Sequence, residues 1–263
     1  MQEFDLAKAA YLQAIDIGRS DASLYELEAD RNINLMTVLF EKSESPEEVG
    51  QIAIEACDQA LVINPESKIA FINKTIAYNI LGQHQIRIGL EPVALDKSIE
   101  AAQKATGFAD ISKIPQMATR QLEAIPYSYM GAAYYRKGLY ELGKGLDPRP
   151  TLKNAIDAFD MALRISPFYD FIYKNSGDVH WGRARYEMSK GLDAVASLNS
   201  SIENYKKAIS INSENMFYHN GLGNAYEIRG EYELLCGLSP ITWLEKAIES
   251  YQKAITIKAI KRQ

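Results

Sequence analysis

Histidine is the residue type of this sequence that could most readily bind a metal ion, and the chain has three, His84, His180 and His219. His180 and His219 occupy comparable places in successive stretches of the chain and could approach each other. A zinc site, however, needs at least three placed protein ligands. Two histidines alone make a poor site, so the sequence predicts no bound metal.

Three glutamates, Glu141, Glu187 and Glu233, recur 46 residues apart and raise the question of paired-carboxylate chemistry. Such chemistry requires two carboxyl groups within several ångströms of each other. A regular 46-residue separation instead places them on different structural units. We interpret them as parts of solvated helix faces.

The two cysteines, Cys57 and Cys236, lie far apart on stretches that are otherwise apolar. A small thiol in such a setting is typically buried and unreactive. We therefore expect no disulfide and a reducing, cytoplasmic environment.

Motifs that bind phosphate or activate a nucleophile are missing from the sequence. It contains no G-x-x-x-x-G-K-[ST], G-x-S-x-G, H-E-x-x-H or C-x-x-C pattern. We expect no cofactor and no enzymatic activity, and an enzyme on a repeat scaffold is the weakest of the functional hypotheses.

The composition is that of a folded protein, with 47% hydrophobic and 24% charged residues. A net charge of −5 provides no general attraction for nucleic acid or for an anionic membrane. No stretch approaches the length and apolarity of a membrane span, and the N-terminus lacks a signal-peptide core. A protein or peptide is the expected partner.

The helices that must position any site repeat every 46 residues. Four series keep this step: Gly131, Gly177 and Gly223; Tyr140, Tyr186 and Tyr232; Gly145, Gly191 and Gly237; Ala162, Ala208 and Ala254. The pattern predicts a single array over residues 1–263. Its parts are a half repeat (1–20), repeats at 21–65, 66–106, 125–167, 168–213 and 214–258, and an insertion at 107–124.

Each repeat reads as two amphipathic helices, because apolar residues recur at spacings of three and four. Between them stand four related turns, which begin at Gly89, Gly145, Gly191 and Gly237. We expect the glycine to be left-handed, the following leucine to make a hydrophobic contact, and an Asp or Ser to cap the next helix. The turn at Ser45-Pro46 lacks this glycine and should be less regular.

The second helix carries Ala155, Phe159 and Ala162, with Pro167 five residues later. This spacing, with Gly223 and Tyr226 in a first helix, resembles the tetratricopeptide (TPR) repeat family. The resemblance implies an all-α solenoid, a right-handed superhelix of antiparallel helix pairs. Because the family unit has 34 residues, both helices should be longer here. The elongated unit also resembles the C-terminal arrays of large bacterial serine/threonine protein kinases.

In TPR arrays the first helix of each pair lines the concave face, and the resemblance implies where a partner would bind. The expected exposed positions lie three residues before, and one and four residues after, each repeated glycine. They are Ser128, Ala132 and Tyr135; Lys174, Asp178 and Trp181; Asn220, Asn224 and Glu227.

The favoured function is a scaffold or regulatory module that binds a protein or peptide, as part of a larger signalling protein. The alternative is a switch that senses a peptide or metabolite. The opening helix, with Leu6, Tyr11 and Ile15, has no preceding partner in the repeat scheme. We therefore expect upstream repeats or self-association through this N-terminal helix.

Overall fold

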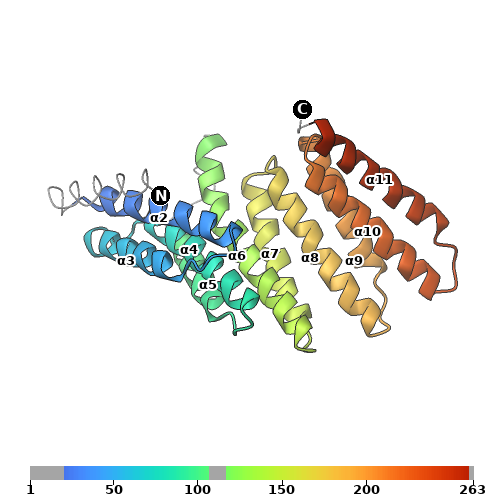
Figure 1. Cartoon of the computed structure of the whole chain (residues 1–263), viewed down its shortest axis with the longest axis horizontal. Coiled ribbons are helices and arrows are strands. Elements are labelled where there is room, and N and C mark those ends of the chain that lie inside the picture. Colours follow the sequence, from blue (N-terminus) through green and yellow to red (C-terminus); the bar gives the residue numbers. More distant parts are fainter. Residues whose placement is uncertain (1–20, 107–116, 261–263) are drawn as a thin grey trace. The chain divides into compact units, whose positions relative to one another are not determined.

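The computed structural model describes residues 21–106 and 117–260, and every regular element in these ranges is an α-helix (Figure 1). This confirms the all-α prediction. The expected N-terminal half repeat and most of the expected insertion lie outside the described residues. Residues 117–124, which the repeat scheme assigned to the insertion, begin a long helix.

The chain divides into two compact units, Met1–Lys137 and Gly138–Gln263. The first contains α2 (Ala22–Glu41), α3 (Glu47–Ile63), α4 (Lys68–Arg87), α5 (Val93–Thr106) and the greater part of α6 (Met117–Gly143). The second contains α7 (Arg149–Ile165), α8 (Asp170–Ser189), α9 (Val195–Ile211), α10 (Met216–Leu235) and α11 (Ile241–Ile260).

Helices that follow each other in sequence pack together in both units. The most extensive contacts join α2 with α3, α4 with α5, α8 with α9, and α10 with α11. We call the first helix of each pair an A helix and the second a B helix. Each pair also contacts the next, through α3 with α4 in the first unit and α9 with α10 in the second. The expected stack of helix hairpins is therefore present within each unit, and the superhelical path stays a prediction.

The turn glycines have the left-handed backbone that the sequence predicted. Gly89, Gly145, Gly191 and Gly237 have φ values of 81°, 76°, 66° and 74°. At Gly145 the amide donates to the carbonyl of Leu142, and the next amide, that of Leu146, donates to Glu141. These two bonds define a Schellman motif, which satisfies carbonyl groups at the helix end. The other three turns repeat it.

The turn aspartates cap the B helices as expected. Asp147 accepts the amide of Arg149 at 3.0 Å, and Asp193 accepts that of Val195 at 2.9 Å. The expected contact of the turn leucine is wrong, however, because Leu146 is 58% exposed and Leu238 is 57% exposed. Hydrogen bonds and the glycine conformation close these turns without that contact.

The turn before α3 is as regular as the others, which contradicts the sequence prediction. Ser43 takes the left-handed place of the glycine, with φ 63°. Its amide donates to Phe40 and the amide of Glu44 donates to Leu39, which is the same Schellman pattern. The hydrogen bonds therefore hold the turn, and the absent glycine adds strain without changing its shape.

Close approach of the paired helices depends on glycine. A Cβ built on Gly138 would lie 2.6 Å from Leu152, and one on Gly223 would lie 2.5 Å from Tyr251. Because neither distance leaves room for a methyl group, a side chain there would push the helices apart. The small residue and the large residue that fills the space beside it are thus one packing unit.

Candidate functional site

Six of the nine residues expected to line a partner groove lie on the A helices of the second unit. Lys174, Asp178 and Trp181 belong to α8, and Asn220, Asn224 and Glu227 belong to α10. The other three, Ser128, Ala132 and Tyr135, lie on α6 in the first unit.

On α8, bonds within the repeat hold two of these side chains. Lys174 pairs with Asp178 at 2.7 Å, and the two side chains are 28% and 22% exposed. The hydroxyl of Tyr205 on α9 also donates to the Asp178 carboxylate. Asp178 therefore links the two helices of its own repeat, and a ligand would have to compete with both partners.

On α10, the equivalent bonds come from Tyr251 of α11. Its hydroxyl lies 2.6 Å from the carboxylate of Glu227 and 2.8 Å from Oδ1 of Asn224. Burial, with a contribution from Glu227, raises the pKa of Tyr251, so the hydroxyl keeps its proton and donates it. Asn220, one turn earlier, is exposed.

Trp181 is half-buried on α8. The guanidinium of Arg185 lies over its ring, 4.9 Å from the centroid. Its indole Nε1 is buried and has no hydrogen-bond acceptor among the described residues. Since a buried N–H without an acceptor is costly, this atom is a natural donor to a ligand carbonyl.

Ser128 is 7% exposed, so its expected exposure is wrong. The register of the repeat placed it on the open face, but at this place α6 buries the short serine side chain. Ala132 and Tyr135 are half-buried.

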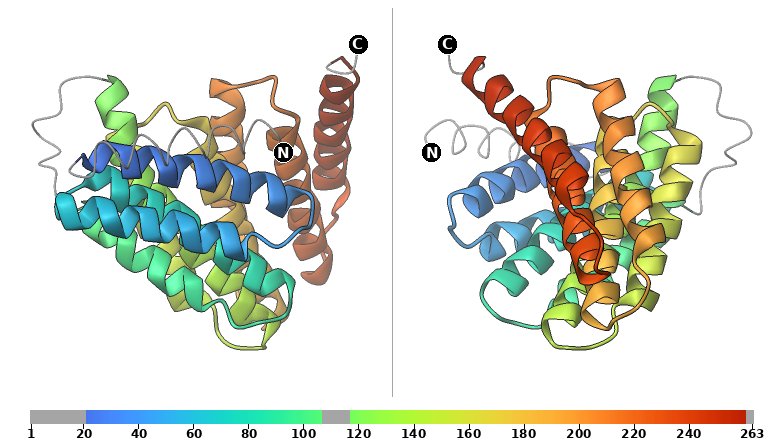
Figure 2. Two further views of the ribbon diagram at one scale, coloured as in Figure 1. Left: turned by 60° about the vertical axis from the view of Figure 1, so that its left-hand side comes forward. Right: turned by 90° about the vertical axis from the view of Figure 1, so that its right-hand side faces the viewer.

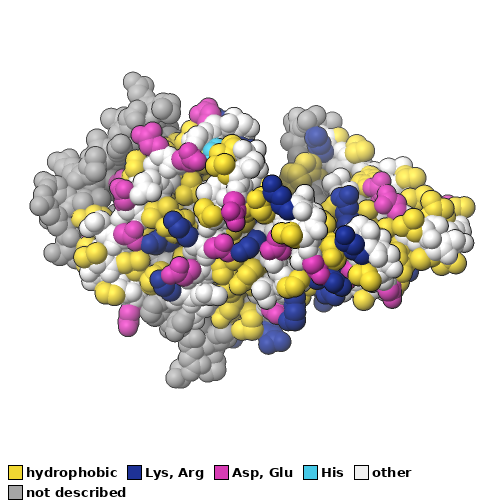
Figure 3. All heavy atoms as spheres, turned by 90° about the horizontal axis from the view of Figure 1, so that it is seen from below, with side chains coloured by type: hydrophobic (Ala, Val, Ile, Leu, Met, Phe, Trp, Pro, Cys, Tyr) yellow, Lys and Arg dark blue, Asp and Glu magenta, His cyan; other side chains and the backbone are white. Residues whose placement is uncertain are grey.

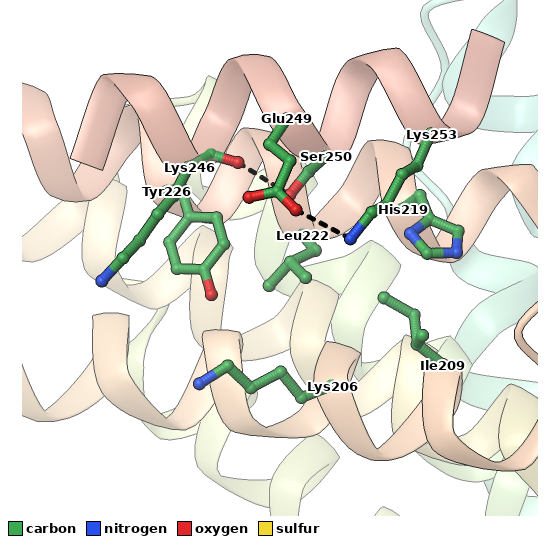
Figure 4. Close-up of a pocket in the computed structure, with 9 residues that line it drawn as sticks. All are labelled: Lys206, Ile209, His219, Leu222, Tyr226, Lys246, Glu249, Ser250 and Lys253. Carbon is green, nitrogen blue, oxygen red and sulfur yellow. Dashed lines mark hydrogen bonds and ion pairs between the residues drawn. The ribbon is translucent and has the colours of Figure 1, made fainter. Parts of the chain in front are cut away.

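A hollow of about 300 Å³ lies on the opposite side of the helix pairs, where the sequence analysis expected no site (Figure 4). The A helix α10 forms its floor with His219, Leu222 and Tyr226. The B helices form its walls, with Lys206 and Ile209 from α9 and Lys246, Glu249, Ser250 and Lys253 from α11. A second depression, of about 530 Å³, adjoins it and continues along α11 to Ile260.

The rim of the hollow carries more positive than negative charge, because three of its residues are lysines and one is a glutamate. Lys253 pairs with Glu249 at 2.9 Å, as the dashed line in Figure 4 marks. The ammonium of Lys246 lies over the ring of Trp243, 4.5 Å from its centroid. An apolar floor with a cationic rim is suited to an amphipathic segment with acidic side chains.

The repeated glutamates are not solvated, which corrects the sequence interpretation. Glu187 is 6% exposed and pairs with Arg183 at 2.8 Å. Glu233 pairs with Arg229 at 2.7 Å, and Glu141 accepts the hydroxyl of Thr151 at 2.9 Å. Each carboxylate is enclosed at the end of an A helix, where a neighbouring donor offsets the cost of burial.

The histidines occupy separate environments. Burial, reinforced by Arg183, lowers the pKa of His180 to about 4, so this imidazole is neutral at pH 7. A ring nitrogen of His219 lies 2.9 Å from the carbonyl of Ser213. Within residues 21–106 and 117–260, no three His, Cys, Asp or Glu side chains are grouped so that they could hold a metal ion.

The cysteines differ from each other, against the expectation that both are buried. Cys57 is buried, and burial raises its pKa to about 12, so the thiol is unreactive. Cys236 is exposed at the C-terminal end of α10. Both are free thiols. None of the described helices combines the length and apolarity that a membrane span requires.

Comparison with solved structures identifies the fold. The crystal structure of MamA matches with a TM-score of 0.50 and 21% identity, over 82% of this chain and 92% of that chain. YrrB, described as a TPR protein with an unusual peptide-binding site, matches with a TM-score of 0.48 and 15% identity, over 95% and 93%. TTC0263, a thermophilic TPR protein of Thermus thermophilus, matches at 0.44 and 16%, over 88% and 95%.

The chain has a TPR-like helical-repeat fold. At 21% identity the likeness to MamA establishes the fold and nothing further. No protein-family model and no curated protein sequence matches the chain.

The TPR-like fold explains why sequence reasoning missed the hollow. The family resemblance directed attention to the A helices, whereas the lysine rim stands on the B helices α9 and α11. Lys206 and Lys246 do not share a repeat position, since they are 40 rather than 46 residues apart. Only the packing of α9 and α11 on either side of α10 brings them together.

Proposed function

We propose that this chain is a protein-interaction module, and that the hollow between α9 and α11 binds an acidic, amphipathic segment of a partner protein. The observation that carries the proposal is the joining of an apolar floor, Leu222 and Tyr226, to a rim that includes Lys206 and Lys246. The floor would bury the apolar face of the segment, and the lysines would select its charge and accelerate encounter.

A peptide selection tests the proposal. A displayed library of random 16-residue peptides would be selected against the immobilised full chain at physiological salt. We expect enrichment of acidic amphipathic sequences. The double variant Lys206→Glu/Lys246→Glu should weaken binding of the enriched peptides about tenfold or more, equivalent to about 1.4 kcal/mol. Binding should also weaken as salt is raised.

Lys153→Glu is the matched control, because Lys153 is a solvent-exposed lysine of α7, in the same unit. It changes the net charge in the same direction without altering the hollow. Equal loss of binding in this control would mean that charge acts at long range and that the hollow is not the site. Failure to enrich any peptide would contradict the proposed function.

The face of the A helices is the second candidate surface, and we propose it as the concave groove of the array. Its supporting observation is the buried indole nitrogen of Trp181, which lacks an acceptor among the described residues. If the enriched peptides lose affinity for Trp181→Ala and keep it for Lys206→Glu/Lys246→Glu, this face is the binding surface and the hollow is not.

We propose further that both units belong to one repeat array within a larger signalling protein. The repeat period supports continuity, because the same turn precedes a B helix in each unit, at Gly89 and at Gly145. A sensing switch has no comparable support, since the exposed hollow does not enclose a small ligand.

A further inference from the structure

The last helix, α11, exposes a face whose counterpart on α9 is covered. Leu244, Ile248 and Ile255 stand 46 residues after Leu198, Ile202 and Ile209. Leu198 and Ile202 are 0% and 4% exposed, whereas Leu244, Ile248 and Ile255 are 39%, 56% and 67% exposed. In the right-hand view of Figure 2, α11 lies in front, and no other described helix crosses it.

The helix that covers this face of α9 is α10. Ile202 and Tyr205 of α9 form one buried cluster with Leu222 and Ala225 of α10. Further along, Leu198 packs against Ile228 and Tyr232 of α10. Because α11 repeats the α9 side chains at the same spacing, α10 is a template for what α11 can bind.

The template requires a glycine at one position. A Cβ on Gly221 of α10 would lie 2.3 Å from the ring of Tyr205, which no real side chain tolerates. Tyr251 holds the place of Tyr205 on α11, one 46-residue step later. A helix seated on α11 in the manner of α10 therefore needs a glycine where it crosses Tyr251.

The template also specifies a charge. Arg229 of α10 reaches Asn199 of α9, with Nη1 3.4 Å from Oδ1. The residue 46 places after Asn199 is Glu245, which is exposed on α11. A basic side chain at the place of Arg229 would meet a carboxylate there, and a charged pair is stronger than the charge-to-amide contact of the template.

The apolar surface continues past α11 at the turn that joins it to α10. Leu234, Leu235 and Leu238 are 64%, 73% and 57% exposed. Hydrophobic side chains gather at this end of the chain in Figure 3. A contiguous surface of this kind on a folded protein commonly marks an interface.

We propose that the outer face of α11 docks an amphipathic helix of a partner protein in the way that α9 docks α10. The partner helix places a glycine over Tyr251, aliphatic or aromatic side chains over Leu244 and Ile248, and a basic residue beside Glu245. A second copy of α11 does not meet these requirements, because Ile241–Ile260 contains no glycine. This inference is independent of the hollow, which opens on the other side of α11.

A peptide copy of residues 214–238, which span α10, serves as the probe, labelled for fluorescence anisotropy against the full chain. We expect saturable binding. Ile248→Glu in the chain should weaken it at least tenfold, and so should Gly221→Leu in the peptide. Val62→Glu is the matched control, because Val62 is a 76% exposed apolar residue of α3, and this variant should bind normally.

An isolated 25-residue peptide is only partly helical, so a second measurement removes that dependence. In an extended chain, residues 212–238 are repeated directly after Ile257, which keeps the 46-residue step. This extension should raise the melting temperature, and the same extension with Gly221→Leu in the added copy should not.

Absence of peptide binding, together with an unchanged melting temperature, would overturn the proposal. Sedimentation showing a dimer that Ile248→Glu dissociates would also overturn it, in favour of a second copy as the occupant. Peptide binding that survives Ile248→Glu but is lost in Lys206→Glu/Lys246→Glu would assign the peptide to the hollow and equally contradict docking on α11.

Discussion

At the scale of single residues, the B-helix tyrosines join packing and polar contact in one side chain. The ring of Tyr205 lies against Gly177 of its own repeat and against Gly221 of the next. Its hydroxyl passes beyond the apolar layer and donates to Asp178. A phenylalanine there would keep the packing and leave the half-buried carboxylate with one donor fewer, which is why tyrosine suits the position.

His180 should make folding stability depend on pH. Its pKa is lowered from the ordinary 6.5 to about 4 by burial and then by Arg183. Below pH 6.5 the unfolded chain binds a proton that the folded chain refuses, so stability is full above pH 6.5 and falls as the pH drops toward 4. By pH 5 the loss should reach about 2 kcal/mol.

Urea unfolding of the wild type and of His180→Phe between pH 7.5 and pH 5 measures this effect. The wild type should lose stability faster than the variant over that range. Parallel curves would show that His180 does not titrate differently in the folded and unfolded chains.

The sequence could predict the role of a residue where the repeat surrounds it on all sides. Tyr205 was expected in the core and is 3% exposed. Period and polarity were insufficient where an ion pair or a helix end decides burial. Glu187 is buried because Arg183 lies one turn before it, and Cys236 is exposed because α10 ends there.

At the scale of helices and turns, one Schellman motif serves five A-to-B connections. Four have glycine in the left-handed position, and the turn before α3 has Ser43. A left-handed conformation costs an ordinary L-residue roughly 1–2 kcal/mol, and glycine escapes this cost at the expense of a more flexible unfolded chain.

Ser43→Gly should therefore stabilise the chain by about 1 kcal/mol, with no change in helix content. Thermal or urea unfolding followed by circular dichroism measures the shift. Gly191→Ala is the opposite case, since it adds a side chain at φ 66°, and it should destabilise by a similar amount. A destabilised Ser43→Gly variant would mean that the serine side chain contributes more than its backbone strain costs.

Sequence signals were strongest for the turns, because glycine, aspartate and proline act through their own backbone and nearest neighbours. Gly145 and Asp147 behave as their residue types predict. The leucine between them was expected to pack and remains exposed, because a hydrophobic contact depends on what lies beside the turn in space. The hollow was missed for the same reason, since three helices must assemble before it exists.

At the scale of the whole molecule, the second unit is built by nearest-neighbour contact. Its described helix α9 packs on α8 within its pair and on α10 of the next pair. A B helix with neighbours on both sides, such as α9, buries Leu198, while the terminal α11 leaves Leu244 exposed. The sequence could predict this succession of helices, but not which of its faces a partner uses.

The recurrence of left-handed glycines at Gly191 and Gly237 makes the chain divisible in a way that most folds are not. Excision of residues 192–237 joins Gly191 to Leu238 and removes 46 residues, one whole period. In the shortened chain α11 would follow α8, and Tyr251 would meet Gly177 as Tyr205 does now. We expect this product to fold with the same kind of turn, because every interface it needs already exists between equivalent residues.

Circular dichroism and gel filtration would establish whether the excised chain is helical and monodisperse. A control excision of residues 192–235, two residues shorter, rotates α11 out of phase with α8 and should aggregate or unfold. Should both chains fold equally well, the packing would be indifferent to register. The junction between periods is therefore a place where recombination can lengthen or shorten the protein without inventing a new core.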